Sequence, residues 1–157
     1  MKKFELTAES KINIFGKKLF RIKALISFGD VEEGETGGWI EKEENLEQSS
    51  GDAWVSDNAE VYGNAWVYGN ARVSDNAEVS GNADYTTIHG FGTQFRTTTF
   101  FQCEDKQIRV SCGCFLGTIP EFREQVKNTR EGKIAEEYLM IADLMEKHFV
   151  KEKESGE

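Results

Sequence analysis

Alanine and valine recur every six residues through the middle of the chain and set its most regular apolar pattern. Each phrase ends in Asp-Asn or Gly-Asn, and its apolar members are Ala53, Ala59, Ala65, Ala71, Ala77 and Ala83 with Val55, Val61, Val67, Val73 and Val79. Valine suits an inward-facing strand position, whereas Asn and Gly tolerate the left-handed backbone of a tight turn. A period of six therefore predicts short strands separated by turns, the hexapeptide pattern of a parallel β-helix.

The segments on either side of the repeat have ordinary strand and helix patterns. Apolar and polar residues alternate around residues 17–28 and again over 106–117, which predicts strands. Thr118 and Glu121 have the spacing of a capping box, so we expect a short helix through about Val126. After Gly132, a second helix is predicted by one apolar stripe, formed by Ile134, Tyr138, Ile141, Met145 and Phe149.

These patterns predict a mainly β fold of the α+β class with three regions. They are an N-terminal strand region (1–50), the repeat (51–86), and a strand-rich segment with two C-terminal helices (87–157). Five phrases would form a little less than two coils of a β-helix, which leaves both ends of its core open. We therefore expect the N-terminal strands and the C-terminal helix to cap the repeat.

Two stretches of the chain resemble a known group of proteins. Residues 19–59 look like the opening of uncharacterised bacterial and prophage hexapeptide-repeat proteins, and residues 90–122 are similar to a module that follows such repeats in phage-derived proteins. The matching positions are Arg21, Ile22, Ala24, Gly37, Gly38, Trp39, Ile40, Glu41, Asn45 and Leu46. The resemblance implies a left-handed β-helix, in which three phrases close one coil, and a mobile-element origin. It implies no reaction.

If three phrases close one coil, phrases three apart lie on the same face. One face then carries Trp54 and Ser56 with Arg72 and Ser74. Four aromatic side chains are expected to point away from the repeat core, namely Trp54, Tyr62, Trp66 and Tyr68. Because such a patch is rarely left in water, we expect a cover, which is the N-terminal segment or helix, a second subunit, or a stacked ligand.

Charge and composition narrow the function classes. The 157 residues have a formal net charge of −9, which argues against non-specific nucleic-acid binding because that needs a surplus of Lys and Arg. No stretch approaches the roughly 20 apolar residues of a membrane-spanning helix, and the N-terminus lacks a signal-peptide core. We expect a cytoplasmic protein without a membrane partner, in an infected or lysogenic bacterial host. An odd number of cysteines, Cys103, Cys112 and Cys114, suits a reducing compartment.

The stretch GFGTQFRTTT, residues 90–99, combines residue types that could bind a ligand. Its glycines allow a ligand to approach the backbone, Arg96 offers a planar donor fork to a phosphate, and the threonines offer hydroxyls. A strand with a glycine-rich turn explains the same residues without a ligand. The candidate ligand-binding residues are Trp66, Tyr68, Arg72, His89, Phe91, Thr93, Phe95, Arg96, Thr97 and Thr98, with Phe91 and Phe95 as stacking partners for a base.

The same part of the chain also offers residues for two other kinds of site. His89 lies just after the repeat and is the candidate general base if the protein is a hexapeptide acyltransferase, although no acidic partner is identifiable. The three cysteines together with His89 or His148 could supply the ligands of a zinc ion, but Cys112 and Cys114 lack the usual Cys-x-x-Cys spacing. We therefore expect buried core cysteines, no metal and no cofactor.

Three function classes remain. We favour a non-enzymatic phage or prophage protein that forms a homotrimer and holds a small anionic molecule between its subunits. A cyclic nucleotide or an ADP-ribose derivative fits this interpretation, and the protein would then sequester an immune signal as an anti-defence sponge. The alternatives are an acyltransferase that uses His89 and a structural or protein-binding solenoid.

Overall fold

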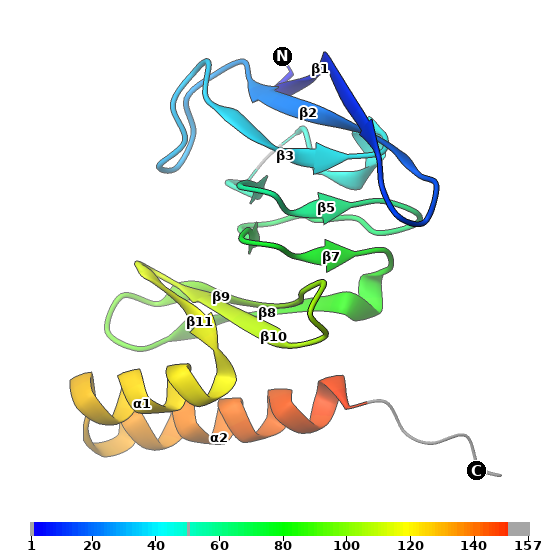
Figure 1. Ribbon diagram of the computed structural model, residues 1–157. Helices are drawn as coiled ribbons and strands as arrows, with labels where there is room; N and C mark the ends of the chain where they lie inside the picture. The colour runs from blue at the N-terminus through cyan, green and yellow to red at the C-terminus, as the bar shows by residue number, and fades with distance from the viewer. Residues whose placement is uncertain (1, 50, 151–157) are drawn as a thin grey trace, which may run out of the picture.

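A computed structural model describes residues 2–49 and 51–150 and shows a mixed α+β fold (Figure 1). The N-terminal strands lie at one end of the molecule, the repeat lies in the middle, and a second sheet with two helices lies at the other end. In chain order the elements are β1 (Phe4–Ile12), β2 (Lys18–Ala24), β3 (Thr36–Ile40), η1 (Glu43–Asn45), β4 (Trp54–Val55), β5 (Glu60–Val61), β6 (Arg72–Val73), β7 (Glu78–Val79), η2 (Asn82–Asp84), β8 (Tyr85–Phe91), β9 (Arg96–Gln102), β10 (Ile108–Cys112), β11 (Phe115–Thr118), α1 (Ile119–Thr129) and α2 (Gly132–Phe149).

The repeat contributes to two separate sheets. One is a mixed five-stranded sheet in the order β1-β2-β3-β5-β7, in which β1, β2 and β3 are antiparallel while β3, β5 and β7 are parallel. The other is the parallel pair β4–β6. Trp54 pairs with Arg72 and Glu60 pairs with Glu78, so phrases 18 residues apart are neighbours in both sheets.

The prediction of a short left-handed parallel β-helix was wrong. The strands of the repeat are only two residues long, and those of the larger sheet continue into antiparallel N-terminal strands. The remaining sheet, β11-β10-β9-β8, is antiparallel throughout. The buried alanines and valines of the phrases share one core cluster with residues of the flanking segments, so the repeat is part of a mixed α+β fold.

The apolar core of the repeat is closed by residues from both flanks. The alanines and valines of the phrases from Ala53 to Val79 are buried together with Ile22 and Ile40 from the N-terminal strands, whereas Ala83 is exposed in η2. At the opposite end, Tyr85, Phe101 and Cys103 of the antiparallel sheet complete the same core. The ends that five phrases leave open are therefore sealed by strands from outside the repeat.

Two of the four aromatic residues expected on the outside are covered by the N-terminal segment. Trp54 is 1% exposed, and its ring meets that of Phe28 edge-on with centroids 5.4 Å apart. Gly37 makes room for this indole, because a Cβ at that position would lie 2.6 Å from Trp54 Cζ2. Tyr62 is buried in a small cluster with Leu19 and Trp39. Trp54 and Tyr62 are thus part of the folded interior.

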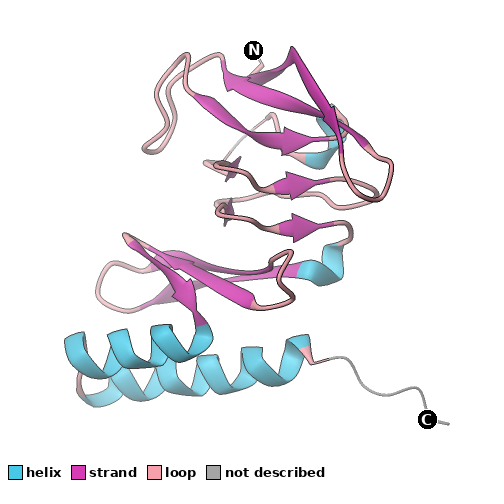
Figure 2. Cartoon of the chain, viewed as in Figure 1, coloured by secondary structure: helices cyan, strands magenta, loops and turns pink. Residues whose placement is uncertain are grey.

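The C-terminal sheet is covered on one face by α1 and α2, which pack side by side (Figure 2). The capping box was predicted correctly, since the Thr118 hydroxyl accepts a hydrogen bond from the Glu121 amide. Helix α1 extends beyond the expected end, to Thr129, and α2 begins at Gly132 as expected. None of the helices in the described part of the chain is long and apolar enough to cross a membrane.

Candidate functional site

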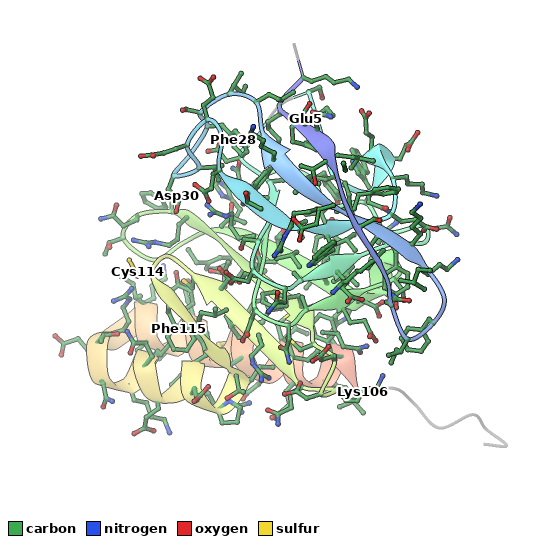
Figure 3. All side chains as sticks on the ribbon, turned by 45° about the horizontal axis from the view of Figure 1, so that its top comes forward. Glu5, Phe28, Asp30, Lys106, Cys114 and Phe115 are labelled. Carbon is green, nitrogen blue, oxygen red and sulfur yellow. The ribbon has the colours of Figure 1, made fainter. Side chains whose placement is uncertain are left out.

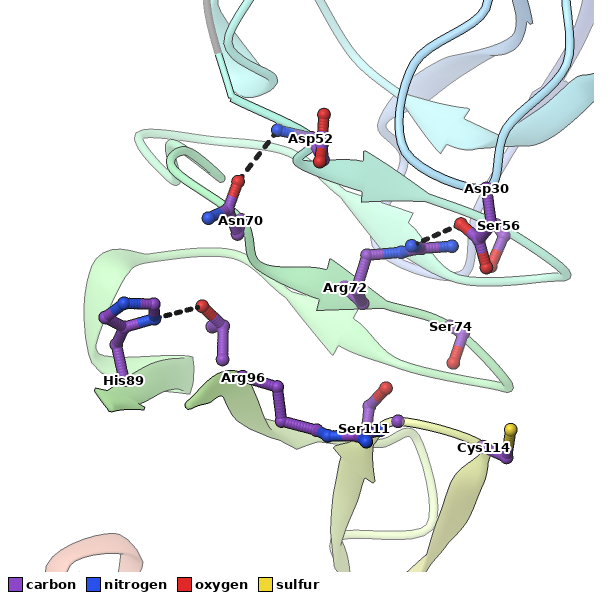
Figure 4. Close-up of a pocket in the computed structure, with 12 residues that line it drawn as sticks. Asp30, Asp52, Ser56, Asn70, Arg72, Ser74, His89, Arg96, Ser111 and Cys114 are labelled. Carbon is purple, nitrogen blue, oxygen red and sulfur yellow. Dashed lines mark hydrogen bonds and ion pairs between the residues drawn. The ribbon is translucent and has the colours of Figure 1, made fainter. Parts of the chain in front are cut away.

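A polar hollow lies between the repeat and the C-terminal sheet (Figure 4). We call this space, of about 460 Å³, the polar cavity. Its walls come from the β4–β6 side of the repeat, from the N-terminal loops and from the ends of β8, β9 and β10. The lining residues are Asp30, Asp52, Ser56, Asn70, Arg72, Ser74, His89, Arg96, Thr97, Ser111, Gly113 and Cys114.

The floor of the polar cavity is formed by side chains that strand alternation directs to one face of the C-terminal sheet. His89 and Thr97 are paired neighbours on β8 and β9, and their side chains share the face that carries Phe101 toward the repeat. His89 Nδ1 lies 3.0 Å from the Thr97 hydroxyl oxygen. Arg96 begins β9 and extends along the floor toward Ser111 (Figure 4).

The repeat supplies the opposite wall. Arg72 is held in place by two contacts, because its backbone amide donates to the Thr99 hydroxyl at 3.0 Å and its guanidinium bonds Asp30 at 2.5 Å. Ser56 and Ser74 occupy the same position in phrases three apart, and both line the cavity. The predicted shared face of Ser56, Arg72 and Ser74 therefore forms one side of this site.

Two carboxylates and two guanidinium groups line the polar cavity, and one carboxylate and one guanidinium form an ion pair. The hydrogen bond from Arg72 lowers the pKa of Asp30, so this carboxylate and guanidinium largely compensate each other. Asp52 acts on the buried Lys3, where burial lowers the pKa of the ammonium group and Glu47 and Asp52 oppose that shift. Among the described residues, Arg96 takes part in no ion pair. Arg96 is thus the guanidinium of this cavity that no described carboxylate contacts as an ion pair.

Four of the ten candidate ligand-binding residues come together here, namely Arg72, His89, Arg96 and Thr97. The other six lie elsewhere. Trp66 and Tyr68 stack on each other with centroids 4.5 Å apart, about half exposed, outside the cavity. Thr98 is buried on the opposite face of β9 and donates to Cys112 Sγ.

The two phenylalanines proposed to stack on a base do not line the polar cavity. Phe91 packs with the apolar residues beneath the sheet, and Phe95 is 64% exposed in the turn before β9. Thr93 is exposed in the same turn. The cavity therefore offers charges, hydroxyls and amides but no aromatic platform.

Several lining residues were missed at the sequence level. Ser56 and Ser74 had a signal, because their place in the phrase put them beside Arg72. Asp30 had none, since it reaches Arg72 across 42 residues of chain. Asn70 belongs to a turn of the repeat, where its side-chain oxygen accepts a hydrogen bond from the Asp52 amide. The repeat pattern indicated only that Asn70 forms a turn.

The three cysteines do not meet. Cys103 is buried in the repeat core, where burial raises its pKa to about 12, while Cys112 faces the helices and Cys114 lies exposed after Gly113. Over residues 2–49 and 51–150, no three His, Cys, Asp or Glu side chains gather as ligands for a metal ion. The cysteines therefore occupy three separate environments.

No protein-family model matches the chain, and no curated protein matches it. The resemblance to phage-derived hexapeptide-repeat proteins stays a prediction.

Proposed function

We propose that the protein is a non-catalytic binding module that holds a small phosphorylated ligand in the polar cavity. The observation that carries this proposal is Arg96, a guanidinium that lies on the cavity floor beside Ser111 and has no acidic partner among the described residues. A planar guanidinium and neighbouring hydroxyls are well suited to phosphate oxygens. Asp52 and the serines offer acceptors to sugar hydroxyls.

The size and location of the cavity refine the expected ligand. Its volume of about 460 Å³ falls within the range of small-molecule sites, which is roughly 300–1,000 Å³. All its lining residues belong to one chain, and we expect one ligand per chain. Because aromatic platforms are missing, the ribose and phosphate groups of a nucleotide-type ligand would supply most of the recognition. In a phage or prophage setting such a module would sequester a nucleotide signal.

The test is isothermal titration with cyclic dinucleotides, cyclic oligonucleotides, ADP-ribose derivatives, acyl-CoA and inorganic phosphate. We expect at least one phosphorylated compound to bind, and Arg96→Gln to weaken it by about tenfold or more, the usual effect of a lost charge-assisted hydrogen bond. Arg123→Gln is the matched control, because Arg123 pairs with Asp143 and Glu146 on the helices.

Failure of every phosphorylated compound to bind would refute the proposal, as would equal affinities for the wild type and Arg96→Gln. Turnover of acyl-CoA that disappears in His89→Ala would instead establish the acyltransferase alternative. Light scattering measures the predicted trimer independently of the ligand.

A further inference from the structure

A second cavity lies beneath the C-terminal sheet, between the tip of the β10–β11 hairpin and the C-terminal half of α1. We call this space, of about 210 Å³, the aromatic cavity. Cys114 and Phe115, labelled in Figure 3, mark its hairpin side. Its lining residues are Arg96, Cys112, Cys114, Phe115, Phe122, Gln125, Val126, Thr129, Arg130 and Tyr138.

Aromatic rings form much of its wall. Phe122 of α1 is central, with its ring centroid 5.7 Å from that of Phe115 and 5.7 Å from that of Tyr138. The contact with Tyr138 is edge-to-face at 89°. Rings in this arrangement present both edges and faces, which is how aromatic side chains prefer to meet another ring.

Two guanidinium groups border this apolar space. Arg96 reaches it from β9, and Arg130 reaches it from the link between the helices. In the part of the chain that the structure describes, neither arginine has an ion pair, and the hydrogen bonds of the Arg130 guanidinium are two 3.5 Å contacts with Thr129. Arg123 of α1 differs from both, because its guanidinium contacts two carboxylates.

The charges of both arginines are felt inside the cavity. Burial, followed by the neighbouring Cys112 thiol, raises the pKa of the Tyr138 phenol, and the guanidinium groups of Arg130 and Arg96 act against that shift. A negative charge placed near this phenol would therefore lie near two guanidinium groups, neither of which is paired with a carboxylate among the described residues. The chemistry that fits is an aromatic ring joined to an anionic group.

Size restricts the ligand further. An apolar cavity of about 150 Å³ accommodates benzene, so about 210 Å³ accommodates one six-membered ring with a small substituent. The space is too small for a nucleotide, and it lies on the opposite face of the sheet from the polar cavity. Arg96 and Cys114 line both cavities.

We propose that the aromatic cavity binds a single-ring aromatic carboxylate, with the ring among Phe115, Phe122 and Tyr138 and the carboxylate facing Arg130 and Arg96. This site does not depend on the proposed function of the polar cavity. Arg130 belongs to the aromatic cavity alone and Arg72 to the polar cavity alone, so the two sites can be separated by substitution.

The test uses benzoate as the probe, followed by chemical-shift changes in two-dimensional NMR spectra of the full chain. Benzylamine and benzamide are the cationic and neutral controls. We expect benzoate to shift signals from β11, α1 and the start of α2, to bind about tenfold more weakly to Arg130→Gln, and to bind Arg123→Gln like the wild type. Benzylamine should not bind.

Three results would overturn the inference: no shifts with benzoate, equal binding of benzamide and benzoate, or equal benzoate affinity in the wild type and Arg130→Gln. A loss of benzoate binding in Arg72→Gln would also overturn it, because the probe would then occupy the polar cavity. Conversely, a phosphorylated ligand that is lost in Arg72→Gln and kept in Arg130→Gln tests the polar cavity alone. Arg96→Gln should weaken both ligands.

Discussion

The two faces of the C-terminal sheet differ in what they contact, so neighbouring residues of one strand lie in different environments. Phe100 and Phe101 are both fully buried, but Phe100 packs against the helices and Phe101 packs into the repeat. Beneath the sheet the paired positions are mostly apolar. Above it, the character changes along the strands from the Tyr85–Phe101 pair to the His89–Thr97 pair.

This difference shows where a binding site can form without loss of core. The upper face closes the repeat core at its Tyr85–Phe101 end, where both rings are buried in that core. The other end of the same face is free to carry Thr97 and His89, and the polar cavity opens there. The polar cavity and the repeat core are therefore adjacent parts of one surface.

The largest effect is expected from Phe101→Ala. Removing this ring opens the end of the repeat core, and such truncations cost about 3–5 kcal/mol, a large share of the roughly 5–15 kcal/mol that stabilises a domain. Urea unfolding of the wild type and the variant measures the loss. Phe95→Ala is the control, because Phe95 is 64% exposed, and its change should stay within about 0.5 kcal/mol. Similar losses in the two variants would show that Phe101 does not seal the core.

A smaller effect distinguishes Thr99 from Thr98, which are adjacent and face opposite sides. The Thr99 hydroxyl accepts from the Arg72 amide, so Thr99→Val leaves that donor unpaired and should cost roughly 1–2 kcal/mol. Thr98 donates only to the thiol of Cys112, a weak acceptor, so Thr98→Val should cost less. Thermal unfolding of both variants makes the comparison, and a larger loss for Thr98→Val would contradict the assignment of faces.

Thr118→Ala tests the helical layer without touching the repeat. Loss of the hydroxyl that caps α1 should cost about 1 kcal/mol, while Thr118→Ser should keep the cap. Amide hydrogen exchange can localise the effect, because faster exchange should be concentrated in the first turn of α1. Equal acceleration in the parallel strands would mean that the two layers open together.

The local features of this fold could be read from the sequence because they depend on near neighbours. The capping box and the second helix after Gly132 follow from spacing. The pairing of Trp54 with Arg72, and with it the place of Ser56 and Ser74 beside Arg72, was expected from the three-phrase coil that the resemblance implies. Spacing says nothing, however, about the antiparallel strands that join the repeat in one sheet, and the β-helix prediction failed there.

The site was harder to predict because distant segments build it. Trp54 occupies an outward position of its phrase, yet Phe28 and the room left by Gly37 turn it into core. Phe91 belongs to a glycine-rich, ligand-like stretch, but strand alternation points it toward the helices. Contacts set by loops, such as that between Asp30 and Arg72, have no period that a sequence pattern can show.

The smallest effect concerns that contact. The side chain of Asp30 is 75% exposed, so its ion pair with Arg72 should contribute less than about 1 kcal/mol. Arg72 lowers the pKa of Asp30 in the folded protein, so the stabilisation is present above the ordinary carboxyl pKa and is lost as the pH falls through the lower folded value. Asp30→Asn should therefore be slightly less stable than the wild type at pH 7, and the difference in unfolding free energy should shrink below about pH 4. A difference that grows on acidification would show that Asp30 is not held as a carboxylate by Arg72.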